Sequence, residues 1–105
     1  MTRICLGDLR DFLDYREGSG GSVEIFDLQV GSDRRKGIGR QLVERLCGGL
    51  QPDIRVWAIT RATNEIAQIF YERCKFTMAC PLRRFYSEDN GVDAIMYIRR
   101  AGGPL

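Results

Sequence analysis

The hydrophobic period of the chain changes twice between residues 23 and 60, and this change limits the possible folds more than any other feature. Residues 23–30, VEIFDLQV, form a β-rich run. From Gly37 to Leu50 the apolar residues recur on one face of a helix, and a pair of glycines stops the pattern. Residues 54–60, IRVWAIT, are almost continuously apolar, as in a strand buried on both faces. A strand, a helix and a strand in this order predict a right-handed crossover between parallel strands.

A hairpin is predicted before this unit. Residues 11–17 alternate imperfectly between apolar and charged side chains, which is typical of an exposed or edge strand. The glycine- and serine-rich residues 18–22 form a flexible loop by composition and lead directly into the run at 23–30. We therefore expect the two segments to pair across this loop.

A second helix and a second hairpin are predicted after the crossover. Thr63 or Asn64 can cap the helix, because either side chain can accept a hydrogen bond from the first turn. Residues 76–86 and 92–99 are expected to form two strands joined by a turn, and Pro81 favours an edge position or a bulge for the first of them. The pattern predicts an α/β domain with a mixed sheet.

Composition excludes several classes of protein. The chain has 105 residues, 44% of them apolar, so residues 1–105 are expected to form a single domain that needs no disulfide or metal. It contains no histidine, which excludes a Ser-His-Asp or Cys-His nucleophile pair and a histidine zinc site. Acid and base chemistry must therefore use carboxylate, tyrosine, cysteine, lysine or water.

Charge and cysteine usage limit the partners and the compartment. The formal net charge of +2 is too small to imply nucleic acid or a membrane as a partner. The four cysteines include no C-x-x-C pair, so they are expected to be buried thiols of a reducing compartment. The sequence contains no signal-peptide pattern and no apolar run of membrane-spanning length. We expect a cytoplasmic location.

A basic turn that contains glycine joins the strand at 23–30 to the first helix. Residues 34–40, RRKGIGR, place Gly37 and Gly39 at the helix N-terminus, where free amides and the helix dipole bind phosphate groups. The turn lacks the Gly-Lys-Ser/Thr of a Walker A loop, and Leu42 stands where a Rossmann fingerprint has its third glycine. The segment therefore predicts an anion site of another kind.

Two motifs in this order resemble the GNAT superfamily of acyl-CoA-dependent N-acyltransferases. Residues 34–39, R-x-x-G-x-G, are similar to the family's pyrophosphate loop. Residues 64–76, NEIAQIFYERCKF, are similar to its N-x-x-A-x-x-[FL]-Y-x-x-x-G-F motif. Residues 84–86 and 94–98 look like its last hairpin, so the similarity covers roughly residues 12–99.

The resemblance implies a GNAT-like mixed, mostly antiparallel sheet with a central parallel βαβ unit and two main helices. It also implies that the family's usual first strand and two helices, which form much of the acceptor-binding wall, are lacking. Lys75 stands where the motif has a glycine, so the turn after the second helix must avoid a positive φ or accept strain. The sheet edge left uncovered in this way favours a homodimer.

The cofactor that the resemblance implies is acetyl-CoA, with a small-molecule or peptide primary amine as acceptor and no metal. The amides of Leu28 and Val30 would hold the thioester carbonyl and the pantetheine, and Asn64 would contact the cofactor arm. The pyrophosphate would be bound by the turn, through Arg34, Arg35, Lys36, Gly37, Ile38, Gly39 and Arg40.

The resemblance also implies two catalytic residues. Tyr71 aligns with the tyrosine that in many members protonates the departing CoA thiolate. Glu24 occupies a position where some members carry a carboxylate base, and its even spacing predicts that it shares a face with Leu28 and Val30. Asp27 and a water relay are the alternatives for the base. The amine would attack the thioester directly through a tetrahedral intermediate, without an acyl-enzyme cysteine.

Two other functions stay open at this stage. The lacking N-terminal elements are also compatible with a non-catalytic CoA-binding or regulatory module. A basic interaction surface for nucleic acid at residues 34–45 would instead bind a duplex in a salt-sensitive way that acetyl-CoA does not relieve.

Overall fold

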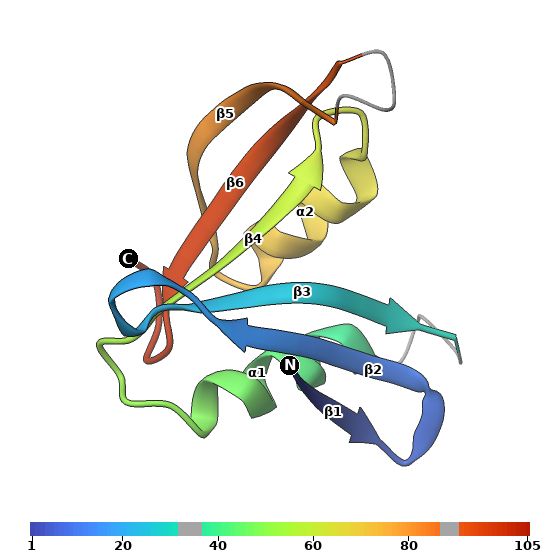
Figure 1. Cartoon of the computed structure of the whole chain (residues 1–105). Helices are drawn as coiled ribbons and strands as arrows, with labels where there is room; N and C mark the ends of the chain where they lie inside the picture. Colours follow the sequence, from blue (N-terminus) through green and yellow to red (C-terminus); the bar gives the residue numbers. More distant parts are fainter. Residues whose placement is uncertain (32–36, 87–90) are drawn as a thin grey trace.

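Within residues 1–31, 37–86 and 91–105, which the structure describes, six strands form one sheet in the order β1-β2-β3-β4-β6-β5 (Figure 1). The structure is a computed structural model. The strands are β1 (Thr2–Leu6), β2 (Asp8–Glu17), β3 (Val23–Val30), β4 (Arg55–Arg61), β5 (Thr77–Tyr86) and β6 (Val92–Arg100). The helices are α1 (Ile38–Gly48) and α2 (Glu65–Arg73), and a short 3-10 turn, η1, spans Ser19–Gly21.

The predicted fold class is confirmed. β2 and β3 pair antiparallel across η1, β3 and β4 pair parallel through α1, and β5 and β6 form an antiparallel hairpin. Asn64 caps α2, because its Oδ1 accepts a hydrogen bond from the Ala67 amide at 3.1 Å. Pro81 lies in the edge strand β5, close to a shift of register between Met78 and Cys80.

The prediction that residues 11–17 form an exposed or edge strand is wrong, because Asp11, Leu13 and Asp14 are buried and the strand is not at the edge. β1 pairs antiparallel with β2, from Thr2 opposite Tyr15 to Leu6 opposite Asp8, and so occupies the edge itself. Sequence analysis missed β1 because the strand has only five residues and its outer half is exposed. β2 is consequently an interior strand with a neighbour on each side.

The parallel pairing between β3 and β4 is short. It runs from Val23 opposite Val56 to Ile25 opposite Ala58, and within the described residues no pair follows. The two strands therefore separate beyond Ile25, and we call the space between residues 26–30 of β3 and β4 the gap. In Figure 1 the two strands point away from each other at their carboxyl ends.

A bulge in β3 lies at the start of the gap. Asp14 of β2 pairs with Asp27, but the next residue of β2, Tyr15, pairs with Ile25, so Phe26 is an additional residue in β3. A bulge of this kind reverses the alternation of side chains on the longer strand. Two side chains of β3, one before and one after Phe26, therefore lie on the same face when their positions differ by an odd number of residues, and not by an even number as in a regular strand.

The two faces of the sheet differ in what lies over them. Both helices pack on one face, which we call the covered face, in a single apolar cluster. The other, the open face, carries no helix of the described residues. The fully buried side chains of the cluster include Leu13, Leu42, Val43, Val56 and Cys74, and each fully buried Leu or Val stabilises the fold by roughly 1.5–3 kcal/mol.

Arg99 closes the end of the covered face opposite the gap. Its guanidinium is 2% exposed and donates to the carbonyl oxygens of Cys74 at 2.9 Å and Ala101 at 3.0 Å. It also pairs with Glu44 of α1 at 3.0 Å. One buried cation thus connects α1, the end of α2 and β6, and its donors are satisfied as a buried charge requires.

The turn after α2 accepts strain at Lys75. This residue has a φ of 70°, in the left-handed region where a side chain costs free energy and glycine does not. The Phe76 amide then donates to the Tyr71 carbonyl at 2.9 Å, which seats Phe76 in the core against α2. Of the two possibilities left by the sequence, the chain therefore adopts the positive φ.

The cysteines are unpaired thiols. Cys47 and Cys74 are buried, whereas Cys5 and Cys80 are only partly buried, so the expectation of buried thiols is met at two of the four positions. Burial raises the pKa of Cys74 to about 11. No helix among the described residues is long and apolar enough to cross a membrane. The described residues also contain no group of three acidic, cysteine or histidine side chains placed to bind a metal.

Candidate functional site

A groove of about 1280 Å³ runs along the covered face between the end of β3, the first turn of α1 and one side of α2. Seven of the predicted site residues line it, namely Leu28, Val30, Gly37, Gly39, Arg40, Asn64 and Tyr71. Ile38 is not among its lining residues and packs against the apolar cluster instead. Arg34, Arg35 and Lys36 lie outside the described residues.

The backbone of β3 offers hydrogen-bonding groups to this groove. The Gly31 amide donates to the Arg10 carbonyl of β2 at 3.0 Å. Successive amides of a strand point to opposite edges, so the amides of Leu28 and Val30 point toward the gap. Within the described residues no strand pairs with β3 at that edge. An extended ligand in the gap can therefore bond to these two amides as an additional strand would.

Among the described residues, no side chain caps the N-terminus of α1. Gly37 precedes the helix with a φ of 68°, makes no side-chain cap, and the first turn contains no acidic residue. The free amides and the positive end of the dipole therefore face the groove beside the exposed Arg40. This arrangement is suited to an anionic group such as a phosphate.

Gly39 has a packing role that the sequence did not reveal. A Cβ at this position would come within 2.9 Å of Cε1 and 3.2 Å of Cζ of the Phe70 ring. The glycine thus allows α1 and α2 to approach each other along the groove wall. Both the predicted anion contact and this packing contact require a small residue here.

Tyr71 lies in a cluster of aromatic rings at the base of the groove. Its ring is 8% exposed, stacks on Tyr97 with centroids 5.9 Å apart, and meets Phe70 and Phe76 edge to face. Burial raises the pKa of the Tyr71 phenol well above its usual value near 10, and the nearby Cys74 and Asp27 groups raise it further. Tyr71 is therefore a neutral hydrogen-bond donor at physiological pH.

One side of α2 supplies groove residues that sequence analysis missed. Ile66 and Ile69 are 75% and 50% exposed although they are apolar, and both line the groove together with Arg73. Apolar residues at helical spacing predict a side that packs inward, so the prediction that Ile66 and Ile69 face the core is wrong, and no pattern in the sequence marked them as groove residues. They form an apolar wall next to Asn64, whose Oδ1 is used for capping.

Glu24 does not share a face with Leu28 and Val30, so that prediction is wrong. Leu28 pairs with Leu13 on the covered face, but the bulge at Phe26 places Glu24 on the open face. There its Oε1 accepts a hydrogen bond from Arg16 Nε at 2.6 Å. Glu24 also lies opposite Trp57, in the part of the sheet where β3 and β4 are still paired.

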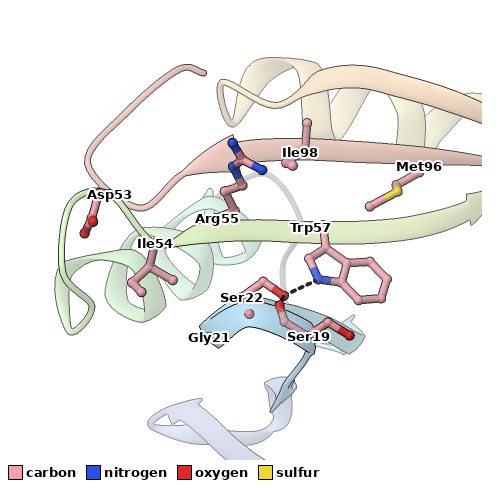
Figure 2. Close-up of a pocket in the computed structure, with 10 residues that line it drawn as sticks. Ser19, Gly21, Ser22, Asp53, Ile54, Arg55, Trp57, Met96 and Ile98 are labelled. Atoms are coloured by element: carbon pink, nitrogen blue, oxygen red, sulfur yellow. Dashed lines mark hydrogen bonds between the residues drawn. The ribbon is translucent and has the colours of Figure 1, made fainter.

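The open face has a hollow of its own, of about 410 Å³, between η1 and the strands β4 and β6. Figure 2 shows Trp57 over the hollow, with Met96 and Ile98 of β6 beside it and Ser22 at the turn. Trp57 Nε1 donates to Ser22 Oγ at 3.3 Å, which fixes the indole. The hollow is separate from the groove and contains none of the predicted site residues.

A parallel strand pair that opens into a gap, next to an uncapped helix N-terminus, defines a class of α/β domain suited to an extended ligand with an anionic group. Residues 6–76 match the family model described as acetyltransferase (GNAT) family. The chain belongs to this family. No curated protein matches it significantly.

Solved structures show the same fold. The ribosomal-protein-S18-alanine N-acetyltransferase of Escherichia coli is 28% identical, with a TM-score of 0.71, over 90% of this chain and 63% of that one. A Bacillus anthracis protein in complex with acetyl coenzyme A is 23% identical, with a TM-score of 0.74, over 86% and 54%. A Bacillus subtilis acetyltransferase in complex with CoA is 19% identical, with a TM-score of 0.74, over 92% and 72%. The chain thus spans less than two thirds of the first two structures.

Proposed function

We propose that the chain is an N-acetyltransferase that transfers the acetyl group of acetyl-CoA to a primary amine. Membership of the GNAT family supports acyl transfer as the class of reaction. The observation that carries the proposal is the groove, where the amides of Leu28 and Val30 and the uncapped start of α1 line one continuous space. Similar proteins from Bacillus species bind acetyl coenzyme A or CoA, which supports the choice of ligand.

The chain's own residues would hold the cofactor in three places. The amides of Leu28 and Val30 would bond to the pantetheine and the thioester carbonyl in the gap. The amides of Gly37, Ile38 and Gly39 and the Arg40 guanidinium would receive the pyrophosphate, together with Arg34, Arg35 and Lys36 of the turn. Asn64 and the apolar wall of Ile66 and Ile69 would border the cofactor arm.

The reaction would be a direct attack of the neutral amine on the thioester carbonyl through a tetrahedral intermediate. The amides at the gap would stabilise the oxygen that becomes negative. A CoA thiol with a pKa near 8.5 is a stronger acid than the buried Tyr71 phenol. Tyr71 would therefore stabilise the departing thiolate with a hydrogen bond rather than give up its proton outright.

Calorimetric titration with acetyl-CoA tests the cofactor site. Arg40→Glu places a negative charge at the start of α1, and Arg45→Glu makes the same change at the other end of the helix, away from the groove. We expect Arg40→Glu to weaken binding by about tenfold or more and Arg45→Glu to leave it within about twofold. Absence of binding by the folded chain would refute the proposal.

An amine screen then separates transfer from binding alone. Release of CoA with any primary amine supports the enzyme, whereas binding without release supports the alternative of a non-catalytic CoA-binding module. Tyr71→Phe keeps the stacked ring and removes the hydroxyl, so it is expected to lower kcat by at least about tenfold with little change in acetyl-CoA affinity.

We also propose that the chain forms a homodimer. β1 is a sheet edge, and the opposite edge, β5, is interrupted by Pro81 and by shifts of register. Regular edges pair readily with a second copy across a two-fold axis. Light scattering on the eluting protein should give twice the chain mass at micromolar concentration, and a monomer under those conditions would refute the dimer.

A further inference from the structure

Carboxylates on the open face are the candidates for binding a cationic amine. Asp14 lies opposite Asp27 in the register of β2 and β3, and Glu24 lies on the same face before the bulge. Two of the three are already paired. Arg3 donates to both oxygens of Asp14, at 2.7 and 2.8 Å, and Arg16 donates to Glu24 at 2.6 Å.

The arginines of these pairs are held in place a second time by aromatic rings. The guanidinium of Arg3 lies 3.9 Å from the centroid of Phe12, and that of Arg16 lies 4.6 Å from the centroid of Phe26. Stacking on a ring adds about 0.5–1 kcal/mol to an exposed cation. An incoming ammonium would therefore have to displace a well-held arginine to reach Asp14 or Glu24.

Asp27 is different. Among residues 1–31, 37–86 and 91–105 it has no ion pair, and its side chain accepts one long hydrogen bond, from Gln29 Nε2 at 3.4 Å. It is only partly buried, so water and solutes reach it. Of the three carboxylates Asp14, Glu24 and Asp27, Asp27 is thus the one that is free to bind a cation.

The position of Asp27 connects the two faces. It follows the bulge residue Phe26, lies beyond the last parallel pair at Ile25, and precedes Leu28, whose amide points into the gap. On the covered side of the gap stands Tyr71, and the charge of Asp27 is one of the causes that raise the pKa of its phenol, after burial and Cys74. Because Tyr71 lines the groove with Leu28 and Val30 on the covered side, and Asp27 lies on the open face beyond the last parallel pair, the two residues border the same gap from opposite sides.

We propose that Asp27, rather than Glu24, binds the ammonium group of the acceptor at the gap and takes its proton, so that the acceptor approaches from the open face. This inference rests on the proposed acetyl transfer. Asp27 accepts one proton from the ammonium, and the nitrogen lone pair forms the bond to the acetyl carbon. The carbon–sulfur bond breaks with its electrons on sulfur. The second proton of the amine ends on the CoA thiol, and Asp27 returns its proton to water.

Asp27→Asn and Glu24→Gln form a matched pair for the test, because each removes a charge and keeps the size of the side chain. We would measure CoA release from pH 6 to 10 with spermidine, lysine methyl ester and a tripeptide with a free amino group as acceptors. The affinity for acetyl-CoA, measured by calorimetry, is expected to stay within about twofold of wild type in both variants, because the groove is unchanged.

For Asp27→Asn we expect kcat/KM to fall by at least about 100-fold at pH 7. With the tripeptide, whose α-amino group has a reference pKa near 8, the deficit should shrink toward pH 10, where this amine is already neutral and needs no base. Among the described residues, the titratable groups that interact with Asp27 are Arg3 and the neutral Tyr71 phenol, and Asp14 lies opposite it in the register. Arg3 stays charged throughout this range, and Asp14 stays ionised. Glu24→Gln is expected to stay within about threefold of wild type.

Three results would overturn the inference. The first is a kcat/KM of Asp27→Asn within threefold of wild type at every pH. The second is a loss of kcat/KM in Asp27→Asn by the same factor at every pH. The third is a pH-dependent loss of kcat/KM in Glu24→Gln and not in Asp27→Asn. A wild-type chain that binds no acetyl-CoA, or that releases no CoA with any of the amines, would refute the proposed function itself. The two failures are therefore distinguishable.

Discussion

The two faces of the sheet shield their aromatic and apolar side chains from water in different ways. On the covered face, α1 and α2 exclude water from a continuous cluster that includes Leu13 and Tyr97. On the open face, arginines lie over Phe12 and Phe26 and are fixed by Asp14 and Glu24. The covered face therefore derives its stability from burial, whereas the open face keeps charged groups in water beside the gap.

A single additional residue in β3 decides which face of the sheet its side chains occupy. The additional residue Phe26 moves Glu24 to the open face and leaves Leu28 on the covered face. If the proposed function is correct, the cofactor is held from one face and the amine arrives from the other. The gap between β3 and β4 is the place where they meet.

The largest expected effect on stability distinguishes two neighbouring residues of β2, Leu13 on the covered face and Phe12 on the open face. Leu13→Ala removes a fully buried side chain from the covered face and should lower the free energy of unfolding by about 3 kcal/mol. Phe12→Ala removes a larger side chain from the open face and should cost less than about 1.5 kcal/mol, because the ring is only partly buried and lies under the exposed Arg3. Urea denaturation measures both, and equal losses would contradict the distinction between the faces.

A smaller effect of opposite sign is expected at the end of α2. Lys75→Gly removes the side chain from a position with a φ of 70° and should stabilise the covered face by about 1 kcal/mol. Lys75→Ala serves as the control, since alanine keeps a Cβ and should give little or no gain. A destabilising glycine in the same denaturation experiment would contradict strain at this turn.

The open face should contribute stability that depends on pH. The bidentate hydrogen bonds from Arg3 hold the pKa of Asp14 below its usual range. A depressed pKa contributes stability that is fully present above the unfolded value near 3.9 and is lost as pH falls through the folded value. Asp14→Asn should therefore lower the urea midpoint at pH 7, and its difference from wild type should shrink as the pH falls below about 4.

Arg3→Met is the control for this pH dependence. This variant removes the guanidinium and leaves the Asp14 carboxylate, so the pKa of Asp14 should return toward its usual value. The part of the stability that is lost in acid should then disappear, as in Asp14→Asn. The urea midpoint of the wild type should fall more between pH 5 and pH 3 than the midpoint of Asp14→Asn does. An equal or smaller decrease for the wild type would contradict a stabilising role of the Arg3–Asp14 pair.

The smallest effect is expected at the hollow of the open face. Ser22→Ala removes the hydroxyl that accepts from Trp57 Nε1 and should cost about 0.5–1 kcal/mol. Trp57 is the only tryptophan of the chain, so its fluorescence directly reports the freed indole. An unchanged emission spectrum would mean that this hydrogen bond does not hold the ring in solution.

Much of the fold could be predicted from the sequence because it depends on local patterns. The change of period gave the βαβ unit, the glycine-rich turn gave the hairpin, and Asn64 was identified as a possible cap. Most predicted groove residues lie together because the strand end, the turn and α1 are adjacent in the chain. Their roles as cofactor and catalytic residues stay predictions. The structure adds Ile66, Ile69 and Arg73 as further groove residues that a binding experiment can test.

Other features were decided by contacts between residues far apart in the chain. The bulge at Phe26 exists only relative to the register with β2, so no pattern within β3 could show it. Arg99 looks like an ordinary charged residue near a strand end, yet it is buried because Cys74, Glu44 and Ala101 surround it with partners. The sequence by itself determined the elements and their order, since neighbours set helix and strand periods. Only the tertiary structure decided which face each carboxylate occupies, because register and the divergence of β3 from β4 depend on the whole sheet.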